Sequence, residues 1–121
     1  MNNNRILIHD TSDVYIKLIN TKFLNCENIF YTNNMFNFDN IKFDEFSLII
    51  ILVNSYDDLV DLAYLYRLKN VRLVVGSFTK SIFHKLMYFP DIDLFDLNTP
   101  KKDLIKIIKG HIYYESFIQR D

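Results

Sequence analysis

The sequence predicts a single α/β domain in which helices cover both faces of a parallel five-stranded sheet. Two observations lead to this prediction. Short runs of β-branched and aliphatic residues alternate along the chain with longer amphipathic segments, and strands joined by helical crossovers pair in parallel. The most apolar of these runs, Leu48–Val53, has no polar position, which is typical of a strand buried on both faces.

Length and composition limit the class of protein. The chain has 121 residues, half of them hydrophobic, so one domain over residues 1–121 can bury a core without a metal or a disulfide. The formal net charge of -1 argues against a broad nucleic-acid interface. No apolar run approaches the roughly 20 residues that span a bilayer, and Met1–Arg5 does not resemble a signal peptide. We therefore expect a cytoplasmic protein without nucleic-acid or membrane partners, in which the single cysteine, Cys26, packs as a small apolar group.

The first half of the chain predicts two strands with a helix between them, followed by an irregular segment. Arg5–Asp10 is a β-branched run, and the polar residues after it can cap a helix over Asp13–Leu24. Asn28–Tyr31 is a second strand. Asn33–Asp44 is rich in asparagine, so we place only a short or irregular helix there.

The second half of the chain repeats the alternation more clearly. Strands and helices are expected, in turn, at Ser47–Val53, Asp57–Lys69, Val71–Val75, Thr79–Met87, Asp93–Leu97 and Lys101–Arg120. The first of these helices carries acids in its first turn and bases in its last, as the helix dipole favours. Right-handed crossovers then favour the flavodoxin-like strand order 2-1-3-4-5.

Element order and strand ends resemble the receiver domain of two-component response regulators, the CheY-like family, over nearly the whole chain. Asp10 ends the first strand, Gly76 and Ser77 end the fourth, and Pro100 follows the fifth. The resemblance implies a phosphoryl-transfer site at these strand ends. Such a site needs two acids after strand 1 and a phosphoacceptor aspartate after strand 3, which together hold Mg²⁺. It also has a threonine or serine after strand 4 and a lysine before the proline.

Most of the residues that such a site needs are absent. An ungapped match places Leu52 at the phosphoacceptor position, and a shift of two residues reaches Asn54. Neither side chain can carry an acyl phosphate. Ser77 stands one position from the expected hydroxyl, or it caps the next helix, and Thr99 replaces the lysine. We therefore predict a degenerate pseudo-receiver with no catalytic residue, no cofactor and no metal site.

The sequence leaves three points open. Asp10, the single acid kept after strand 1, can instead be a helix cap or a loop carboxylate. The strand-end crevice can instead bind a small ligand, or an unexpected carboxylate, Asp10 or Asp57, can accept a phosphoryl group. The resemblance also implies a cis peptide between Thr99 and Pro100.

Aromatic residues on the last two helices predict a contact surface. At about 100° per residue, the core stripe of the last helix contains Leu104, Ile107, Ile108, Ile112 and Ile118. Tyr113 and Phe117 point away from this stripe and Tyr114 lies at its boundary, while the preceding helix adds Phe83 and Met87. In receivers the face of helix 4, strand 5 and helix 5 is the usual contact surface. The resemblance thus implies a protein partner or a homodimer through this face, and a role as an interaction module in bacterial signal transduction.

Overall fold

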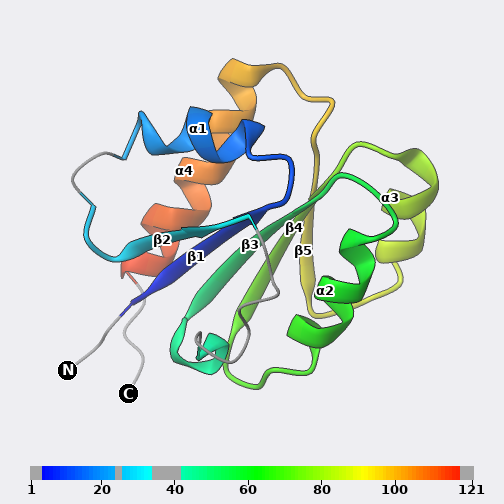
Figure 1. The fold of residues 1–121 in the computed structure, drawn as a ribbon, viewed down its shortest axis with the longest axis horizontal. Helices are drawn as coiled ribbons and strands as arrows, with labels where there is room; N and C mark the ends of the chain where they lie inside the picture. The colour runs from blue at the N-terminus through cyan, green and yellow to red at the C-terminus, as the bar shows by residue number, and fades with distance from the viewer. Residues whose placement is uncertain (1–3, 24–25, 34–41, 118–121) are drawn as a thin grey trace.

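The computed structural model describes residues 4–23, 26–33 and 42–117. Five strands form one sheet in the order β2-β1-β3-β4-β5, and every neighbouring pair is parallel (Figure 1). The strands are β1 (Ile6–Asp10), β2 (Ile29–Thr32), β3 (Leu48–Val53), β4 (Arg72–Ser77) and β5 (Ile92–Asp96). The predicted parallel sheet and its strand order are therefore confirmed.

Helices cover both faces of this sheet, as predicted. They are α1 (Val14–Asn20), α2 (Asp58–Tyr66), α3 (Lys80–Leu86), α4 (Lys101–Phe117) and a short 3-10 helix, η2 (Phe43–Glu45). Figure 1 shows α1 and α4 on one face of the sheet and α2 and α3 on the other. The described residues contain four α-helices, whereas five helical segments were predicted. The irregular helix expected over Asn33–Asp44 falls mostly outside the described residues, and η2 lies at its end.

The sheet divides the core into two layers. β3 is buried along its whole length, and its side chains alternate between two hydrophobic clusters. Those that pack with α1 and α4 are Leu48, Ile50 and Leu52. Those that pack with α2 and α3 are Ile49, Ile51 and Val53. Because both faces of β3 are covered, the strand needs no polar position.

Gly76 lies where β4 passes close to the aromatic ring of Phe95 in β5. A Cβ atom at residue 76 would lie 2.6 Å from Cζ of Phe95 and 3.0 Å from Cδ2 of Leu97. The first distance is too short for van der Waals contact. A glycine in β4 therefore allows the neighbouring side chains to pack against the backbone.

The helices α1, α2 and α3 are shorter than predicted. The helix predicted over Asp13–Leu24 ends at Asn20, and the hydroxyl of Thr21 donates to the carbonyl oxygen of Leu18 (2.8 Å). This bond satisfies a carbonyl of the last turn that has no partner within the helix. α2 and α3 are likewise shorter than predicted at both ends.

Two local expectations are wrong. No cis peptide occurs in the described residues, so the Thr99–Pro100 bond is trans. The Thr99 N–H donates to the carbonyl oxygen of Asp96 (3.2 Å), and the Pro100 carbonyl accepts from Leu104 N–H (2.9 Å). The trans bond, the form that X–Pro peptides prefer, therefore leads the chain directly into α4. Cys26, expected to pack as an apolar group, is exposed.

The predicted core stripe of α4 is confirmed at Leu104, Ile108 and Ile112, whereas Ile105 and Glu115 are buried without having been predicted. Ile107, which was predicted in the stripe, is only partly buried, and Ile118 lies outside the described residues. Within those residues, none of the helices has the length and apolar character that a bilayer crossing requires.

Candidate functional site

Asp10 ends β1 at the carboxyl edge of the sheet, and its side chain is completely buried. Oδ1 accepts hydrogen bonds from the N–H (3.0 Å) and hydroxyl (2.7 Å) of Ser12 and from Nδ2 of Asn54 (2.9 Å). Oδ2 accepts from the N–H groups of Tyr15 (2.7 Å) and Ile16 (3.3 Å). Because a carboxylate offers about four lone-pair sites, donors of the same chain occupy this one fully.

These bonds make Asp10 the capping group of α1. Tyr15 and Ile16 lie in the first turn of α1, where N–H groups have no partner within the helix. Asp13, directly before the helix, makes no side-chain cap, so the carboxylate at the end of β1 supplies it. Burial, followed by the negative charge of Asp10, raises the pKa of the Tyr15 hydroxyl. Of the two readings of Asp10, helix cap or receiver acid, this geometry supports the first.

A second buried carboxylate, Asp58, connects the loops that follow β1 and β3. Its Oδ1 accepts from the hydroxyl of Thr11 (2.8 Å), and its Oδ2 accepts from the N–H groups of Asn54 (2.8 Å) and Ser55 (3.2 Å). Asn54 donates in turn to Asp10 (2.9 Å). Thr11 thus ties the loop after β1 to the first residue of α2, and Asn54 ties the loop after β3 to the last residue of β1.

The neighbouring strand residue, His9, is also buried. Its side chain is on the α2 face of the sheet, where Nε2 lies 3.1 Å from Oδ2 of Asp61. Within the described residues Nδ1 has no hydrogen-bond partner. His9 therefore joins β1 to α2 and takes no part in the Asp10 network.

The strand register places Asp10 and Ser77, two of the predicted site residues, on opposite faces of the sheet. Asp10 is paired with Leu52, and Leu52 with Gly76, so all three positions share the face covered by α1 and α4. Leu52 is completely buried in that cluster. Ser77, one residue further along β4, points to the opposite face, and its buried hydroxyl has no partner among the described residues. A hydroxyl at this position does not face Asp10.

Of the predicted site residues, Asn54 is the one that bonds directly to Asp10, and it also donates to the carbonyl oxygen of Leu52 (3.3 Å). Thr99 is half-buried in the turn before α4. In the part of the chain that the structure describes, no three His, Cys, Asp or Glu side chains are grouped so that they could hold a metal ion. The polar side chains at the carboxyl edge of the sheet therefore form hydrogen bonds with the backbone and with the adjacent loops.

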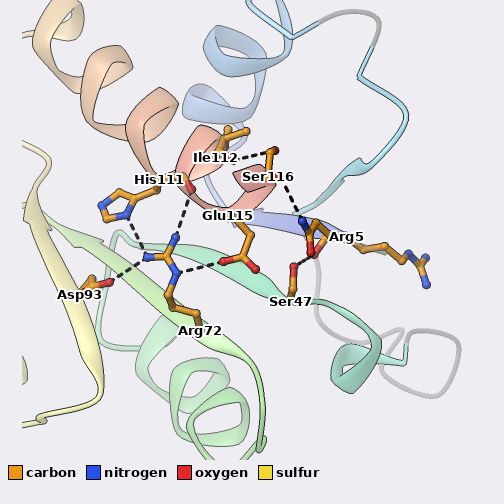
Figure 2. Close-up of polar contacts among 9 residues, drawn as sticks. Arg5, Ser47, Arg72, Asp93, His111, Ile112, Glu115 and Ser116 are labelled. Carbon is orange, nitrogen blue, oxygen red and sulfur yellow. Dashed lines mark hydrogen bonds and ion pairs between the residues drawn. The ribbon is translucent and has the colours of Figure 1, made fainter. Parts of the chain in front are cut away.

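A second polar cluster, which the sequence did not indicate, lies at the amino end of β4. Arg72 donates from Nε to Oε1 of Glu115 (3.2 Å) and from Nη1 to Oδ2 of Asp93 (3.0 Å). Nη1 also lies 3.2 Å from Nδ1 of His111, and Nη2 donates to the His111 carbonyl oxygen (3.2 Å) (Figure 2). One guanidinium thus ties β4, β5 and α4 together.

The burial of this cluster changes the chemistry of its members. The Glu115 side chain is completely buried, and Arg72 is its ion-pair partner. Burial and the Arg72 guanidinium lower the pKa of His111, whereas Asp93 acts in the opposite direction. A helical projection of α4 could have revealed Glu115, because this residue falls within the apolar stripe of Leu104 and Ile108.

The aromatic residues of α4 occupy different surroundings. The Tyr113 ring makes an edge contact with Phe23, which follows α1, at a centroid distance of 6.3 Å. Tyr114 lies on the other side of α4, where the Arg72 guanidinium is 5.1 Å from its ring centroid. Phe117 is 85% exposed. On α3, Phe83 is half-buried, and Met87, directly after the helix, is 64% exposed.

Two grooves lie between neighbouring helices, one on each face of the sheet. The groove between α2 and α3 has a volume of about 350 Å³ and is lined by Leu59, Leu62, Ala63, Tyr66, Arg67, Ile82, Lys85, Leu86, Phe89 and Ile92. The groove between α1 and α4 has a volume of about 380 Å³ and is lined by Leu18, Lys22, Lys101, Lys102, Ile105, Lys106 and Lys109. Each groove needs two helices to form, which is why no single sequence segment predicted it.

Strand order and helix placement together define a Rossmann-like, flavodoxin-like α/β domain. Among solved structures, the chain is similar to a de novo designed Rossmann 2x3 fold protein determined by solution NMR, with a TM-score of 0.75 and 10% sequence identity. The match covers 98% of this chain and 96% of the designed one. At this identity the likeness shows the fold alone. No protein-family model and no curated protein matches the chain, so its relation to receiver domains stays a prediction.

Proposed function

We propose that this chain is a non-phosphorylatable pseudo-receiver that acts as a protein-protein interaction module in bacterial signal transduction. The observation that carries the proposal is the Asp10 carboxylate, which accepts hydrogen bonds from Ser12, Tyr15, Ile16 and Asn54. A carboxylate bonded in this way has no free lone pair for Mg²⁺, which requires several oxygen ligands.

The neighbouring positions support the same proposal. Leu52, at the position of the phosphoacceptor, is buried and has no nucleophilic atom. Thr99, at the position of the lysine, offers no positive charge to a phosphoryl oxygen. A domain with the receiver strand order but without this chemistry can still function by binding another protein through its surface.

The surface proposed for binding is the face of α3, β5 and α4. Exposed apolar side chains occur there at Met87 and Phe117, and Tyr114 is also more than half exposed. Methionine and aromatic residues are enriched in protein interfaces, and fully exposed apolar side chains gain most from being covered. The partner is another protein or a second copy of this chain.

Phosphorylation is tested with acetyl phosphate and Mg²⁺, followed by intact mass measurement. We expect no increase in mass, because the carboxylate nearest to the predicted site is occupied and the phosphoacceptor position is a leucine. A stoichiometric phosphoryl adduct on Asp10 or Asp57 would instead make the chain an atypical receiver and overturn the proposal.

The proposed interface is tested with a double variant, Met87→Ser with Phe117→Ser. Concentration-dependent light scattering of the unaltered protein should show self-association, and the variant should weaken it by about tenfold, since each substitution removes buried apolar area from the dimer. Val60→Ser with Tyr64→Ser, two exposed positions on α2, is the matched control. A protein that stays monomeric at every concentration would contradict the homodimer.

Ser77 favours one alternative, a small-ligand sensor that uses the crevice at the carboxyl edge. Its buried hydroxyl lacks a partner among the described residues, and a ligand oxygen could provide one. A thermal-shift screen of nucleotides and metabolites against the unaltered protein and Ser77→Ala distinguishes the two functions. Ligand stabilisation that Ser77→Ala abolishes would favour the sensor.

A further inference from the structure

We infer that the groove between α1 and α4 binds an acidic, amphipathic segment of a partner protein. This inference deepens the proposed interaction function by naming a second surface and the chemistry of its partner. Five lysines line the groove: Lys22, two residues after the end of α1, and Lys101, Lys102, Lys106 and Lys109 of α4. No aspartate or glutamate lines it.

This concentration of positive charge is unusual for the chain as a whole. The chain has 14 basic and 15 acidic residues, so the five lysines are more than a third of all its cations. None of them forms an ion pair with a described residue, although five other salt bridges occur in that part of the chain. The groove therefore presents charge that the domain itself does not neutralise.

The position of the lysines on α4 opposes the stability of the helix. Lys101 and Lys102 lie in its first turn, where the helix dipole disfavours cations and Asp103 is the one acid, and its last turn contains no basic residue. Lys102 and Lys106 are four residues apart and repel each other on one face of the helix. An anionic partner would relieve both effects, because its negative charge would lie at the helix N-terminus and between the ammonium groups.

The floor of the groove indicates the kind of anion that fits. Leu18 is half-buried and Ile105 is buried, and both line the groove beneath the lysine side chains. The groove therefore has an apolar floor and a rim of cations. A segment fits it by inserting an aliphatic or aromatic side chain and placing a carboxylate on each side of that side chain. Nucleic acid would place phosphates, and no inserted side chain, against this floor.

The probe is a short fluorescent peptide that forms an amphipathic helix, with leucines along one face and glutamates on both flanks. It is titrated into the isotope-labelled full chain, and binding is followed by fluorescence anisotropy and by amide chemical shifts. We expect the shifts to concentrate in α1 and α4. The same peptide with glutamine in place of glutamate should bind at least about tenfold more weakly, as should the original peptide at high salt.

Lys102→Glu with Lys106→Glu reverses two charges of the groove at exposed positions, so the fold should be retained. We expect the variant to weaken peptide binding by about tenfold or more. Lys69→Glu with Lys80→Glu makes the same change in net charge at exposed positions outside the groove, and should change binding by less than about twofold.

Several results would overturn the inference. Equal weakening by the two double variants would mean that only net charge matters, and shifts spread over α2 and α3 would place the peptide elsewhere. Tighter, groove-dependent binding of single-stranded DNA or of phosphatidylserine vesicles would identify a different occupant. Failure of the peptide to bind leaves the phosphorylation result and the α3-β5-α4 interface unaffected, so this inference and the proposed function fail separately.

Discussion

Each end of the sheet contains a charged side chain that organises its surroundings, Asp10 at the carboxyl end and Arg72 at the amino end, and the two charges are opposite. At the carboxyl end, the Asp10 carboxylate collects donors from one helix and two loops. At the amino end, the Arg72 guanidinium collects acceptors from β5 and α4 (Figure 2). The first end is where sheets of this class place binding and catalytic groups, and the second is remote from it.

The guanidinium nitrogens of Arg72 and the carboxylate oxygens of Asp10 all have partners within the domain, but the two residues differ in exposure. Arg72 is 19% exposed in its side chain, and each of its nitrogens already has a partner within the domain. Asp10 is completely buried, and its two oxygens accept more hydrogen bonds than a carboxylate usually has lone pairs. Asp10 occupies a position where this fold class often has a functional residue. Its hydrogen bonds nevertheless give it a structural role, as those of Arg72 do at the opposite end of the sheet.

Removing the carboxylate at the carboxyl end should have the largest effect on stability. Asp10→Ala leaves the first-turn N–H groups of Tyr15 and Ile16 and the amide of Asn54 without their acceptor in a buried site. We expect a loss of about 3 kcal/mol in the free energy of unfolding, measured by urea denaturation.

Asp57→Asn is the matched control for this prediction. Asp57 directly precedes α2, is exposed, and makes no side-chain cap. Its replacement should change the free energy of unfolding by less than about 0.5 kcal/mol. A similar small change for Asp10→Ala would mean that the carboxylate is not the cap of α1 and remains available to a ligand.

At the amino end, we expect Glu115→Ala to cost somewhat less. The substitution removes the buried partner of Arg72, but the guanidinium keeps Asp93 and the His111 carbonyl and remains partly exposed to water. A loss of about 2 kcal/mol is expected in the same measurement, below the range for breaking a fully buried pair.

Asp93→Ala tests the exposed ion pair of Arg72, for comparison with its buried pair to Glu115. The Asp93 side chain is 57% exposed, and its bond to Arg72 has a similar length to that of Glu115. We expect its removal to cost less than about 1 kcal/mol. Equal costs for Glu115→Ala and Asp93→Ala would contradict the assignment of burial as the decisive factor.

The sequence predicted the sheet well because strand burial leaves a local pattern. The apolar run of β3 predicted a strand covered on both sides, and the polar residues after β1 predicted where α1 would begin. Helix ends were predicted less accurately, since bonds such as Thr21 to Leu18 decide them locally. The position of Asp10 was predicted, whereas its five hydrogen bonds depend on how the β1 and β3 loops meet.

Tertiary contacts also explain what the sequence did not predict. Arg72, Asp93 and Glu115 are charged residues far apart along the chain, and only the packing of α4 against β4 and β5 brings them together. Lys22 joins the lysines of α4 for the same reason, because α1 and α4 share one face of the sheet (Figure 1). The composition counts these charged residues but does not show that they lie close together in the folded chain.

The smallest expected effect is a pH dependence at the amino-end cluster, which follows from the lowered pKa of His111. Burial and the Arg72 guanidinium lower the pKa of His111 below its ordinary value of 6.5, and Asp93 offsets part of this change. The unfolded chain therefore binds a proton more readily than the folded one. The stability due to this group is fully present above about pH 6.5 and is lost as the pH falls through the lower folded-state pKa.

His111→Gln removes the titratable imidazole and leaves the other residues of the cluster in place. The difference in the free energy of unfolding between the unaltered protein and His111→Gln should therefore shift against the unaltered protein as the pH falls below about 6.5. The shift should stay below about 1 kcal/mol, because His111 is only half-buried and solvent screens its charge. Urea unfolding at several pH values measures it. A difference that is constant with pH would mean that Asp93 cancels the effects of burial and Arg72 on His111, and one that moves in favour of the unaltered protein would mean that Asp93 outweighs them.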